Sequence, residues 1–387
     1  MADIRTEVPG PSRFVLPILG LIALGLCVAG ILVLYDPQGG PNLLASIYDS
    51  LGNTSGATAL RNGSGDQVIA KLLLAVIALL VGVGGIWLLF LLVGGAVGLL
   101  QAKWRDRILP WVFAGPALAL LAVFLLYPAA GTIVRSFQND KGQFTLANFA
   151  VMVEPEFTQI LRNNAIWLIV GTGASVILGL IFAWLFDRVR REALAKTLVF
   201  LPLAISLVGA SVIWTFVYAF QPAGQPQIGL LNAVLVGLGG KPISWLTTSP
   251  INVFCEIIIM IWLQTGFAMV VFSAAIKGVS GEVLEAARLD GATERQVFVR
   301  VIVPMIRGSI VTVSTTIAIV TLKIFDIVFA TTGGRFNDDV VANRMFHEIF
   351  QFFEDGRGAA LATLLFIAVL PVMYINLRNF RRQQVEG

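Results

Sequence analysis

The chain has 387 residues, of which 57% are hydrophobic and only 13% are charged, and its mean hydropathy is +0.84. A soluble domain carries about 25% charged residues, so this composition excludes an ordinary soluble protein and indicates an all-α polytopic membrane protein. The net charge of +4 does not indicate nucleic-acid binding, because the basic residues stand at the ends of apolar runs and not in one patch.

Eight runs of the chain are nearly free of charge and long enough to cross a membrane, since a transmembrane helix needs about 20 apolar residues. The first run is longer than the apolar part of a cleaved signal peptide, so we expect it to anchor the chain. In chain order, the predicted spans cover residues 14–35, 70–100, 108–134, 162–186, 197–220, 251–276, 304–331 and 358–377.

The orientation of these spans follows from lysine and arginine, which are enriched in cytoplasmic loops. If the N-terminus is cytoplasmic, the cytoplasmic segments contain sixteen of these residues and the opposite loops contain seven. The sequence therefore predicts eight transmembrane helices with both termini in the cytoplasm. This topology also makes residues 280–303 cytoplasmic.

Two of the external loops are distinctive. Residues 36–69 are rich in Gly, Asn, Ser and Thr, which predicts a surface loop with little fixed structure. The loop 221–250 has a single charge and contains the short apolar run 228–238. That run is too short to cross the membrane, so we expect an interfacial or re-entrant helix.

The charged segment between the sixth and seventh predicted spans begins with a short predicted helix. Ser280 is a suitable N-cap for it, and Glu285 stands in its first turns, where a carboxylate favours the positive end. Ala286 and Ala287 give this helix a shallow surface, which can insert into a cleft of another protein. The sequence here favours a docking element.

A second short helix is predicted directly after the first. Gly291 supplies the left-handed residue that ends the first helix, and Thr293 with Gln296 forms a capping box that begins the second. Pro304 is expected to begin the seventh span, where its missing amide is tolerated. The alternative is a solvated loop, but antiparallel helices are usually joined by only about 2–8 residues.

The same segment resembles the cytoplasmic loop of ABC importer permeases, the integral membrane subunits that dock on ATPase subunits. In this chain the resemblance includes Val303 where leucine is usual and Gly308 where many relatives have a second proline. It implies that residues 280–303 are coupling helices. The residues that carry the resemblance, and to which it assigns ATPase coupling, are Glu285, Ala286, Ala287, Asp290, Gly291 and Pro304.

The chain has no phosphate-binding loop of the type Gly-x-x-x-x-Gly-Lys-Ser/Thr, because its one Gly-Lys pair, Gly240-Lys241, is followed by Pro242. We therefore expect no cofactor on this chain and no enzymatic activity of its own, with ATP and magnesium bound by partner ATPases. The single histidine, His347, leaves almost no material for a metal site or for histidine-based catalysis.

Polar and aromatic side chains within the spans are candidates for the substrate path, because polar groups are costly in hydrocarbon. Serine and threonine also join helices, aromatic rings also pack, and Lys323 with Asp326 could form a pair, so each assignment has a structural alternative. Glu256 is expected to reach water near the outer boundary. The candidates are Trp214, Tyr218, Met260, Gln264, Phe267, Thr321, Lys323 and Asp326.

Residues 322–346 resemble the maltose-type permeases, and among them the α-glucoside permeases. The resemblance covers residues 108–380 as a six-helix permease core, with 1–107 as a two-span N-terminal addition and 381–387 as a cytoplasmic tail. It implies import of an oligosaccharide across a bacterial cytoplasmic (inner) membrane. The implied partners are a second permease subunit, two ATP-binding subunits and an extracytoplasmic sugar-binding protein.

Other functions remain open from the residues alone. A secondary transporter would need its own ion site among the intramembrane polar groups, and an ABC permease could carry another solute, such as a polyol or a glycerol-linked sugar. A membrane enzyme would need a carboxylate cluster, for which Asp338 and Asp339 are an adjacent pair. Transport without an ATPase would distinguish the first alternative.

Overall fold

A computed structural model describes residues 39–50, 54–61 and 102–386, together with positions 72, 75–76, 79 and 82–85. These parts of the chain are helical, and the described residues contain no β-strand beyond one isolated bridge between Gln138 and Phe144. The all-α prediction is thus confirmed. The predicted spans 14–35 and, for the most part, 70–100 lie outside the described residues.

The chain divides into two compact units, Met1–Tyr127 and Pro128–Gly387. In the first unit, helices α2 (Gly39–Ser50) and α3 (Thr54–Arg61) pack on each other. Ala45, Ala57 and Leu60 form their buried contact, and Arg61 pairs with Asp49 at 2.7 Å. For residues 39–50 and 54–61 of the predicted loop 36–69, the expectation of little fixed structure is therefore wrong, because this small apolar contact stabilises a helix pair inside a polar composition.

Among the described residues, four helices are long and apolar enough to cross a membrane without a sharp bend, and each overlaps a predicted span. They are Phe113–Ser136, Pro155–Phe186, Ile251–Lys277 and Asp355–Asn379. The first is built from α5 (Ala102–Leu121), η1 (Ala122–Leu126) and α6 (Tyr127–Ser136), and the second from α7 (Pro155–Ile166), η3 (Trp167–Thr172) and α8 (Gly173–Phe186). The third is α12 (Ile251–Lys277), and the fourth lies in α19 (Asp355–Glu386).

The fifth predicted span, 197–220, is broken and not continuous. Helix α9 (Glu192–Phe200) with η4 (Leu201–Ala204) meets α10 (Leu207–Val217) at 104°. Ser206 begins α10, because its hydroxyl accepts a hydrogen bond from the amide of Gly209 at 3.0 Å. An N-cap of this kind favours a new helix start over continuation of the old one.

The seventh predicted span is bent as well. Helix α14 (Glu294–Gln296) continues through η5 (Val297–Ile302) and α15 (Val303–Met305), and then meets α16 (Arg307–Leu322) at 72°. Pro304 therefore does not begin the span. Pro304 lies two residues before the bend at Ile306. It is part of α15, which directly follows η5, whose π-helical turn has already displaced the regular helical hydrogen bonds, so the missing amide of proline is tolerated there. With each bent pair taken as one span, the described residues contain up to six spans.

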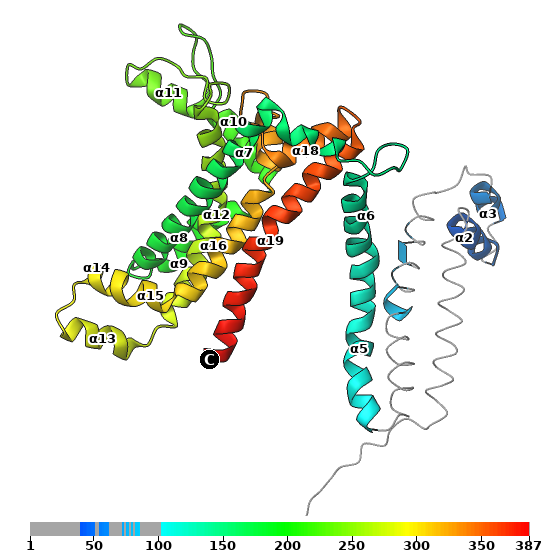
Figure 1. Cartoon of the computed structure of the whole chain (residues 1–387), viewed down its shortest axis with the longest axis horizontal. Helices are drawn as coiled ribbons and strands as arrows, with labels where there is room; N and C mark the ends of the chain where they lie inside the picture. The colour runs from blue at the N-terminus through cyan, green and yellow to red at the C-terminus, as the bar shows by residue number, and fades with distance from the viewer. Residues whose placement is uncertain are drawn as a thin grey trace, which may run out of the picture. The chain divides into compact units, whose positions relative to one another are not determined.

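The core of the second unit forms where α8 lies along α12 (Figure 1). The two backbones approach so closely at Gly179 that a Cβ there would stand 2.4 Å from the Cβ of Ala268. Small residues permit such close packing of membrane helices. Phe272 and Met269 of α12 are fully buried in this core.

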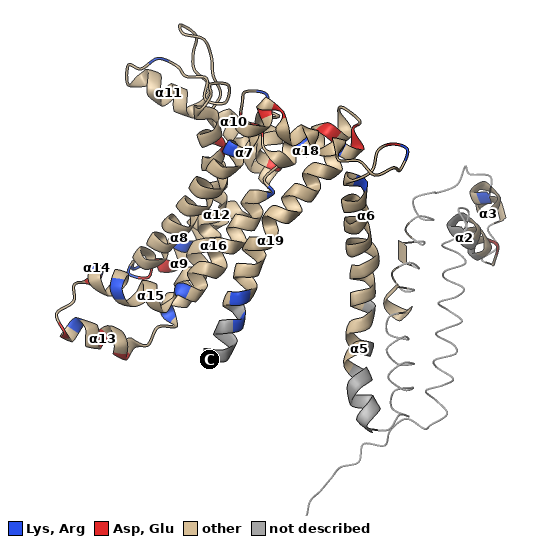
Figure 2. Ribbon diagram, viewed as in Figure 1, with Lys and Arg blue, Asp and Glu red and all other residues tan. Residues whose placement is uncertain are grey.

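Charged residues of the second unit gather toward the ends of its long helices, and the middle stretches are almost free of them (Figure 2). The shorter helices lie between these long ones in the chain: η2 (Ala147–Val153), α11 (Leu230–Gly237), α13 (Gly281–Leu289), α17 (Asp326–Thr331) and α18 (Val341–Phe350). Helix α11 exposes Leu230 and Val234, which suits an interfacial helix, and its placement at a membrane surface stays a prediction.

Candidate functional site

The turn after α13 has the geometry that the sequence predicts. Gly291 has φ +82°, the left-handed conformation that glycine adopts at little cost. The amide of Ala292 donates to the carbonyl of Ala287 at 3.1 Å, a six-to-one bond that closes a Schellman motif. A Cβ on Gly291 would meet no atom within 4 Å. Glycine is therefore required here by the backbone conformation and not by lack of space.

The second helix of the segment begins with the predicted capping box. The Thr293 hydroxyl accepts from the amide of Gln296 at 3.4 Å, and the Gln296 side chain accepts from the amide of Thr293 at 2.8 Å. Ser280 does occupy the N-cap position of α13, but its side chain makes no capping hydrogen bond. The two-helix prediction is confirmed, and the specific role given to the Ser280 hydroxyl is wrong.

Helix α13 presents two different faces. Leu284 and Ala287 pack against the core of the second unit, whereas Glu285 and Ala286 are exposed. Leu289 is 88% exposed although it is apolar. Asp290, Gly291 and Pro304 are exposed too. Five of the six predicted coupling residues are thus exposed, and Ala287 faces the core. The exposed face of α13 is shallow and has an apolar tip at Leu289, a composition that fits contact with another protein. ATPase docking stays a prediction.

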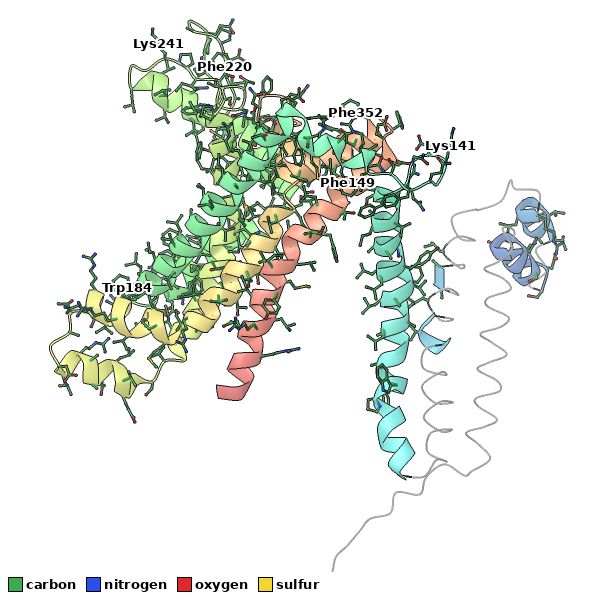
Figure 3. The ribbon with its side chains drawn as sticks, in the orientation of Figure 1. Lys141, Phe149, Trp184, Phe220, Lys241 and Phe352 are labelled. Carbon is green, nitrogen blue, oxygen red and sulfur yellow. The ribbon has the colours of Figure 1, made fainter. Side chains whose placement is uncertain are left out.

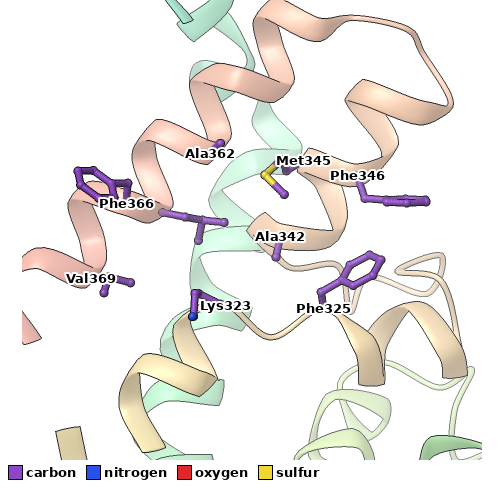
Figure 4. Close-up of a pocket in the computed structure, with 9 residues that line it drawn as sticks. Lys323, Phe325, Ala342, Met345, Phe346, Ala362, Phe366 and Val369 are labelled. Atoms are coloured by element: carbon purple, nitrogen blue, oxygen red, sulfur yellow. The ribbon is translucent and has the colours of Figure 1, made fainter. Parts of the chain in front are cut away.

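A hollow of about 510 Å³ lies at the opposite end of α16 from the coupling segment. The residues that line it come from the end of α16, the start of α17, α18 and α19 (Figure 4). One cation and three aromatic rings are the groups in it that can bind a polar ligand. The lining residues are Lys323, Phe325, Ala342, Met345, Phe346, Ala362, Leu365, Phe366 and Val369.

Lys323 is the one predicted path residue that lines this hollow. Its side chain forms no ion pair with Asp326 within the described part of the chain, so the pairing alternative is not realised here. Phe346, which sequence reasoning did not single out, contacts Phe325 with ring centroids 5.2 Å apart. Phe346 lies on α18, a helix inside a predicted external loop. The amphipathic pattern of apolar and polar residues in α18 is the signal that could have revealed it.

Three other candidates are buried inside the chain. Thr321 and Met260 meet at 3.6 Å between oxygen and sulfur, and Thr321 also lies 3.2 Å from the hydroxyl of Thr172. Tyr218 donates its hydroxyl proton to the carbonyl of Cys255 at 2.9 Å. Each of these side chains is at most 3% exposed. In the single chain they join η3, α10, α12 and α16, and a contact with substrate stays a prediction.

The remaining candidates are partly exposed. Trp214 stands edge-on to Trp262 with centroids 5.8 Å apart, and Gln264 and Phe267 lie on α12 with part of their surfaces accessible. Asp326 begins α17, where its carboxylate suits the helix N-terminus. The structure therefore does not bring all eight candidates into one site. It places them along four helices, α10, α12, α16 and α17, at different depths.

Glu256 differs from the expectation that it reaches water. It is fully buried, and its Oε1 accepts a hydrogen bond from the Thr331 hydroxyl at 2.6 Å. The α16–α17 segment folds back over this part of α12 and covers the carboxylate, a long-range effect that hydropathy does not contain. Glu256 therefore connects α12 to α17 in this structure.

A second, polar hollow of about 390 Å³ lies on the other side of α18, between α7 and the loop 333–339. Asp339 lines it, and burial raises the pKa of this carboxyl to about 6. Burial, and then the charge of Arg344, lower the pKa of His347. Asp338 is buried and accepts from the side-chain amide of Asn252 at 2.9 Å. The carboxylates of Asp338 and Asp339 thus stabilise the loop 333–339. Among the residues that the structure describes, no cluster of metal-ligating side chains occurs.

Comparison with known proteins agrees with this geometry. Residues 175–382 match the family described as the binding-protein-dependent transport system inner membrane component. The osmoprotective compounds uptake permease protein GgtC of Synechocystis sp. is 48% identical over 277 residues, which is 70% of this chain and 99% of that protein. The α-glucoside transport system permease protein AglF of Rhizobium meliloti is 43% identical over 331 residues, covering 82% of this chain and 98% of that one.

A solved structure shares the fold. One chain of a bacterial alginate ABC transporter, crystallised with an alginate pentasaccharide-bound periplasmic protein, superposes with a TM-score of 0.63 at 20% identity and covers 73% of this chain and 98% of that chain. The family match extends over more than half of the sequence and includes the entire coupling segment and the Lys323 hollow. The chain therefore belongs to the binding-protein-dependent transport system inner membrane components, the permease subunits of ABC importers.

Proposed function

We propose that this permease subunit imports an oligosaccharide of the α-glucoside or maltodextrin class. The observation that carries the proposal is the 43% identity to the α-glucoside permease AglF over 98% of that protein's length. The hollow at Lys323 supports it, since an ammonium group beside the rings of Phe325, Phe346 and Phe366 offers hydrogen bonds and apolar faces together. Sugar rings need both kinds of contact.

The proposed assembly places this chain in a bacterial inner membrane with eight spans and both termini in the cytoplasm. A second permease completes the translocation path, and an extracytoplasmic sugar-binding protein delivers the substrate. Because this chain has no phosphate-binding loop, two ATP-binding partner subunits bind ATP and magnesium. Residues Glu285, Ala286, Ala287, Asp290, Gly291 and Pro304 belong to the segment that contacts one of these ATPases.

The proposed mechanism is alternating access. Closure of the ATPases on ATP moves the exposed face of α13, and the helix pair passes this movement to the spans. Each partner must bind one conformation better than the other for the equilibrium to shift. The candidates Trp214, Tyr218, Met260, Gln264, Phe267, Thr321 and Asp326 then define the helices α10, α12, α16 and α17 along which the path opens, and Lys323 contacts the sugar directly.

A second solute class is favoured by a separate observation. GgtC, whose printed name refers to osmoprotective compounds, is 48% identical to this chain and is covered over 99% of its length. A polyol or a glycerol-linked sugar is therefore the second candidate. Both solutes are polyhydroxylated, so the hydrogen-bonding groups of the hollow suit either of them.

Uptake by the purified complex in proteoliposomes tests these proposals. The complex is supplied with ATP inside and with its binding protein and either [¹⁴C]maltose or [¹⁴C]glucosylglycerol outside. We expect ATP-dependent uptake of maltose and little uptake of glucosylglycerol. The opposite preference assigns the osmoprotectant class. Uptake by the permease pair alone, without ATPase subunits, refutes the ABC mechanism and favours a secondary transporter.

A further inference from the structure

The cytoplasmic end of α8 contacts the coupling segment through an aromatic stack. The rings of Trp184 on α8 and Phe298 on η5 are 4.6 Å apart and inclined by 28°. The guanidinium carbon of Arg188 lies 4.5 Å from the centroid of Trp184, in the range of a cation–π contact. Figure 3 shows Trp184 at this end of α8, next to α14.

One carboxylate joins three elements at the same place. Glu294, the first residue of α14, accepts from Arg188 at 2.5 Å through Oε2 and from Arg288 of α13 at 2.7 Å through Oε1. All three side chains are more than 40% exposed. Exposed ion pairs contribute little to stability, so the significance of this bridge lies in the elements it connects.

The residue beside Arg188 connects α8 to two further helices. Asp187 forms an ion pair with Lys196 of α9 and accepts from the hydroxyl of Ser273 on α12 at 2.8 Å. Lys196 also pairs with Glu192 at 2.6 Å, and its side chain is only 16% exposed. The short stretch Asp187–Arg188 therefore links the coupling helices on one side to the cytoplasmic ends of α9 and α12 on the other.

We propose that Arg188 and Glu294 are positioning residues that transmit movement of the coupling helices to α8 and α12. The inference rests on the proposed function, in which an ATPase moves α13. Glu294 keeps α13 and α14 moving as one body through Arg288, and Arg188 carries that movement to α8. Because Asp187 directly precedes Arg188, the same displacement reaches α12 through the contact of Asp187 with Ser273. Without the ion pair between Arg188 and Glu294, α13 moves and the spans do not follow it.

The test uses the complete complex with its ATPases. Nitroxide labels are placed at Arg191→Cys and Arg378→Cys, in a background with Cys27→Ser and Cys255→Ser. The distance between the labels is measured without nucleotide and after trapping with ATP, magnesium and vanadate. The variants are Arg188→Gln, Glu294→Gln and the conservative Arg188→Lys. Arg190→Gln is the matched control, because Arg190 is an exposed neighbour of Arg188 that has no ion pair with any residue of described position.

In the wild type and in Arg190→Gln, we expect trapping to change the label distance. In Arg188→Gln and Glu294→Gln, nucleotide is still trapped but the distance change is lost, and Arg188→Lys restores it. In proteoliposomes, the ATP hydrolysed per maltose transported rises about fivefold in both Gln variants, the equivalent of ~1 kcal/mol. The double variant is no worse than either single one, since the residues act as one bridge.

Two results overturn the proposal. In the first, Arg188→Gln retains the full distance change, as Arg190→Gln does. In the second, the Gln variants lose nucleotide trapping together with the distance change, which makes the bridge part of ATPase docking or assembly. If the wild type shows the distance change but transports no maltose, the sugar assignment fails and the bridge stands, because the distance measurement needs no transported substrate.

Discussion

Substitution of Gly291 separates backbone conformation from surface chemistry in the coupling segment. Gly291 has φ +82°, and a Cβ at this position meets no atom within 4 Å. The cost of a side chain is therefore almost purely conformational. Asparagine visits the left-handed region readily, alanine pays roughly 1–2 kcal/mol, and a β-branched valine pays more. The expected order of damage is Gly291→Asn, then Gly291→Ala, then Gly291→Val.

These costs translate into populations of the turn. Since 1.4 kcal/mol is about a factor of ten in an equilibrium constant, alanine reduces the equilibrium constant for forming the Schellman turn roughly five- to thirtyfold. If the turn and its alternatives are otherwise balanced, the fraction of molecules with the turn falls about three- to fifteenfold. The apparent affinity for a partner that needs the turn falls by the same factor. Valine should weaken it further, and asparagine should leave it within a few-fold of the wild type.

The assay is copurification of the ATPase subunit with the permease pair at several ATPase concentrations. Gly281→Ala serves as the control, because Gly281 lies in open space at a helical backbone conformation of the same helix. Surface expression of the permease is measured in parallel and should not change. Equal ATPase recovery across the Asn, Ala and Val variants would refute the idea that the left-handed turn presents the docking surface.

Three more outcomes are expected. Lys323→Met should raise the KM for maltose about tenfold or more, as loss of a charged hydrogen-bond donor costs ~1.5–3 kcal/mol, whereas Lys241→Met should leave KM unchanged in the same uptake assay. Asp339 has its pKa raised to about 6 by burial. Asp339 therefore keeps its proton to a higher pH in the folded protein than in the unfolded chain, where its pKa has the ordinary value of 3.8. As pH rises from this value to about 6, the free energy of unfolding falls by up to about 3 kcal/mol. The thermal midpoint of Asp339→Asn should fall less than that of the wild type between about pH 4 and 7, and parallel curves contradict this. Gly179→Ala should destabilise the α8–α12 contact by about 1–3 kcal/mol, because its Cβ would lie 2.4 Å from that of Ala268. Gly173→Ala, in open space, should not lower the thermal midpoint, and equal midpoints for both variants would argue against this close packing.

The coupling segment was largely predictable because its signals are local. A left-handed glycine and a capping box each involve residues within one or two turns, so Gly291, Thr293 and Gln296 behave as their sequence context indicates. Pro304 was not predictable in the same way. Its place before the bend depends on the π-helical turn that begins at Val297, and the packing of Val297 in the core is a long-range contact.

Hydropathy located the spans that the structure describes but not their breaks. Residues 197–220 form one apolar run, yet α9 and α10 meet at 104° because Ser206 starts a new helix. A mean hydropathy over about 20 residues does not respond to a single capping hydroxyl such as that of Ser206. The helix pair at residues 39–61 shows the reverse error, since a polar composition concealed the contact of Ala45, Ala57 and Leu60.

The substrate path was the least predictable part, because helical periodicity states which residues share a face but not what that face contacts. Thr321 and Met260 satisfy each other inside the chain, whereas Lys323, two residues later, opens onto a hollow. The difference is that Thr321 contacts Met260 of α12 and Thr172 of η3, whereas Lys323 lies just past the end of α16. In the proposed assembly a second subunit completes the path, so the residues that remain accessible in the single chain are the ones available to a substrate. On that argument Lys323 and the partly exposed Gln264 rank above the buried candidates.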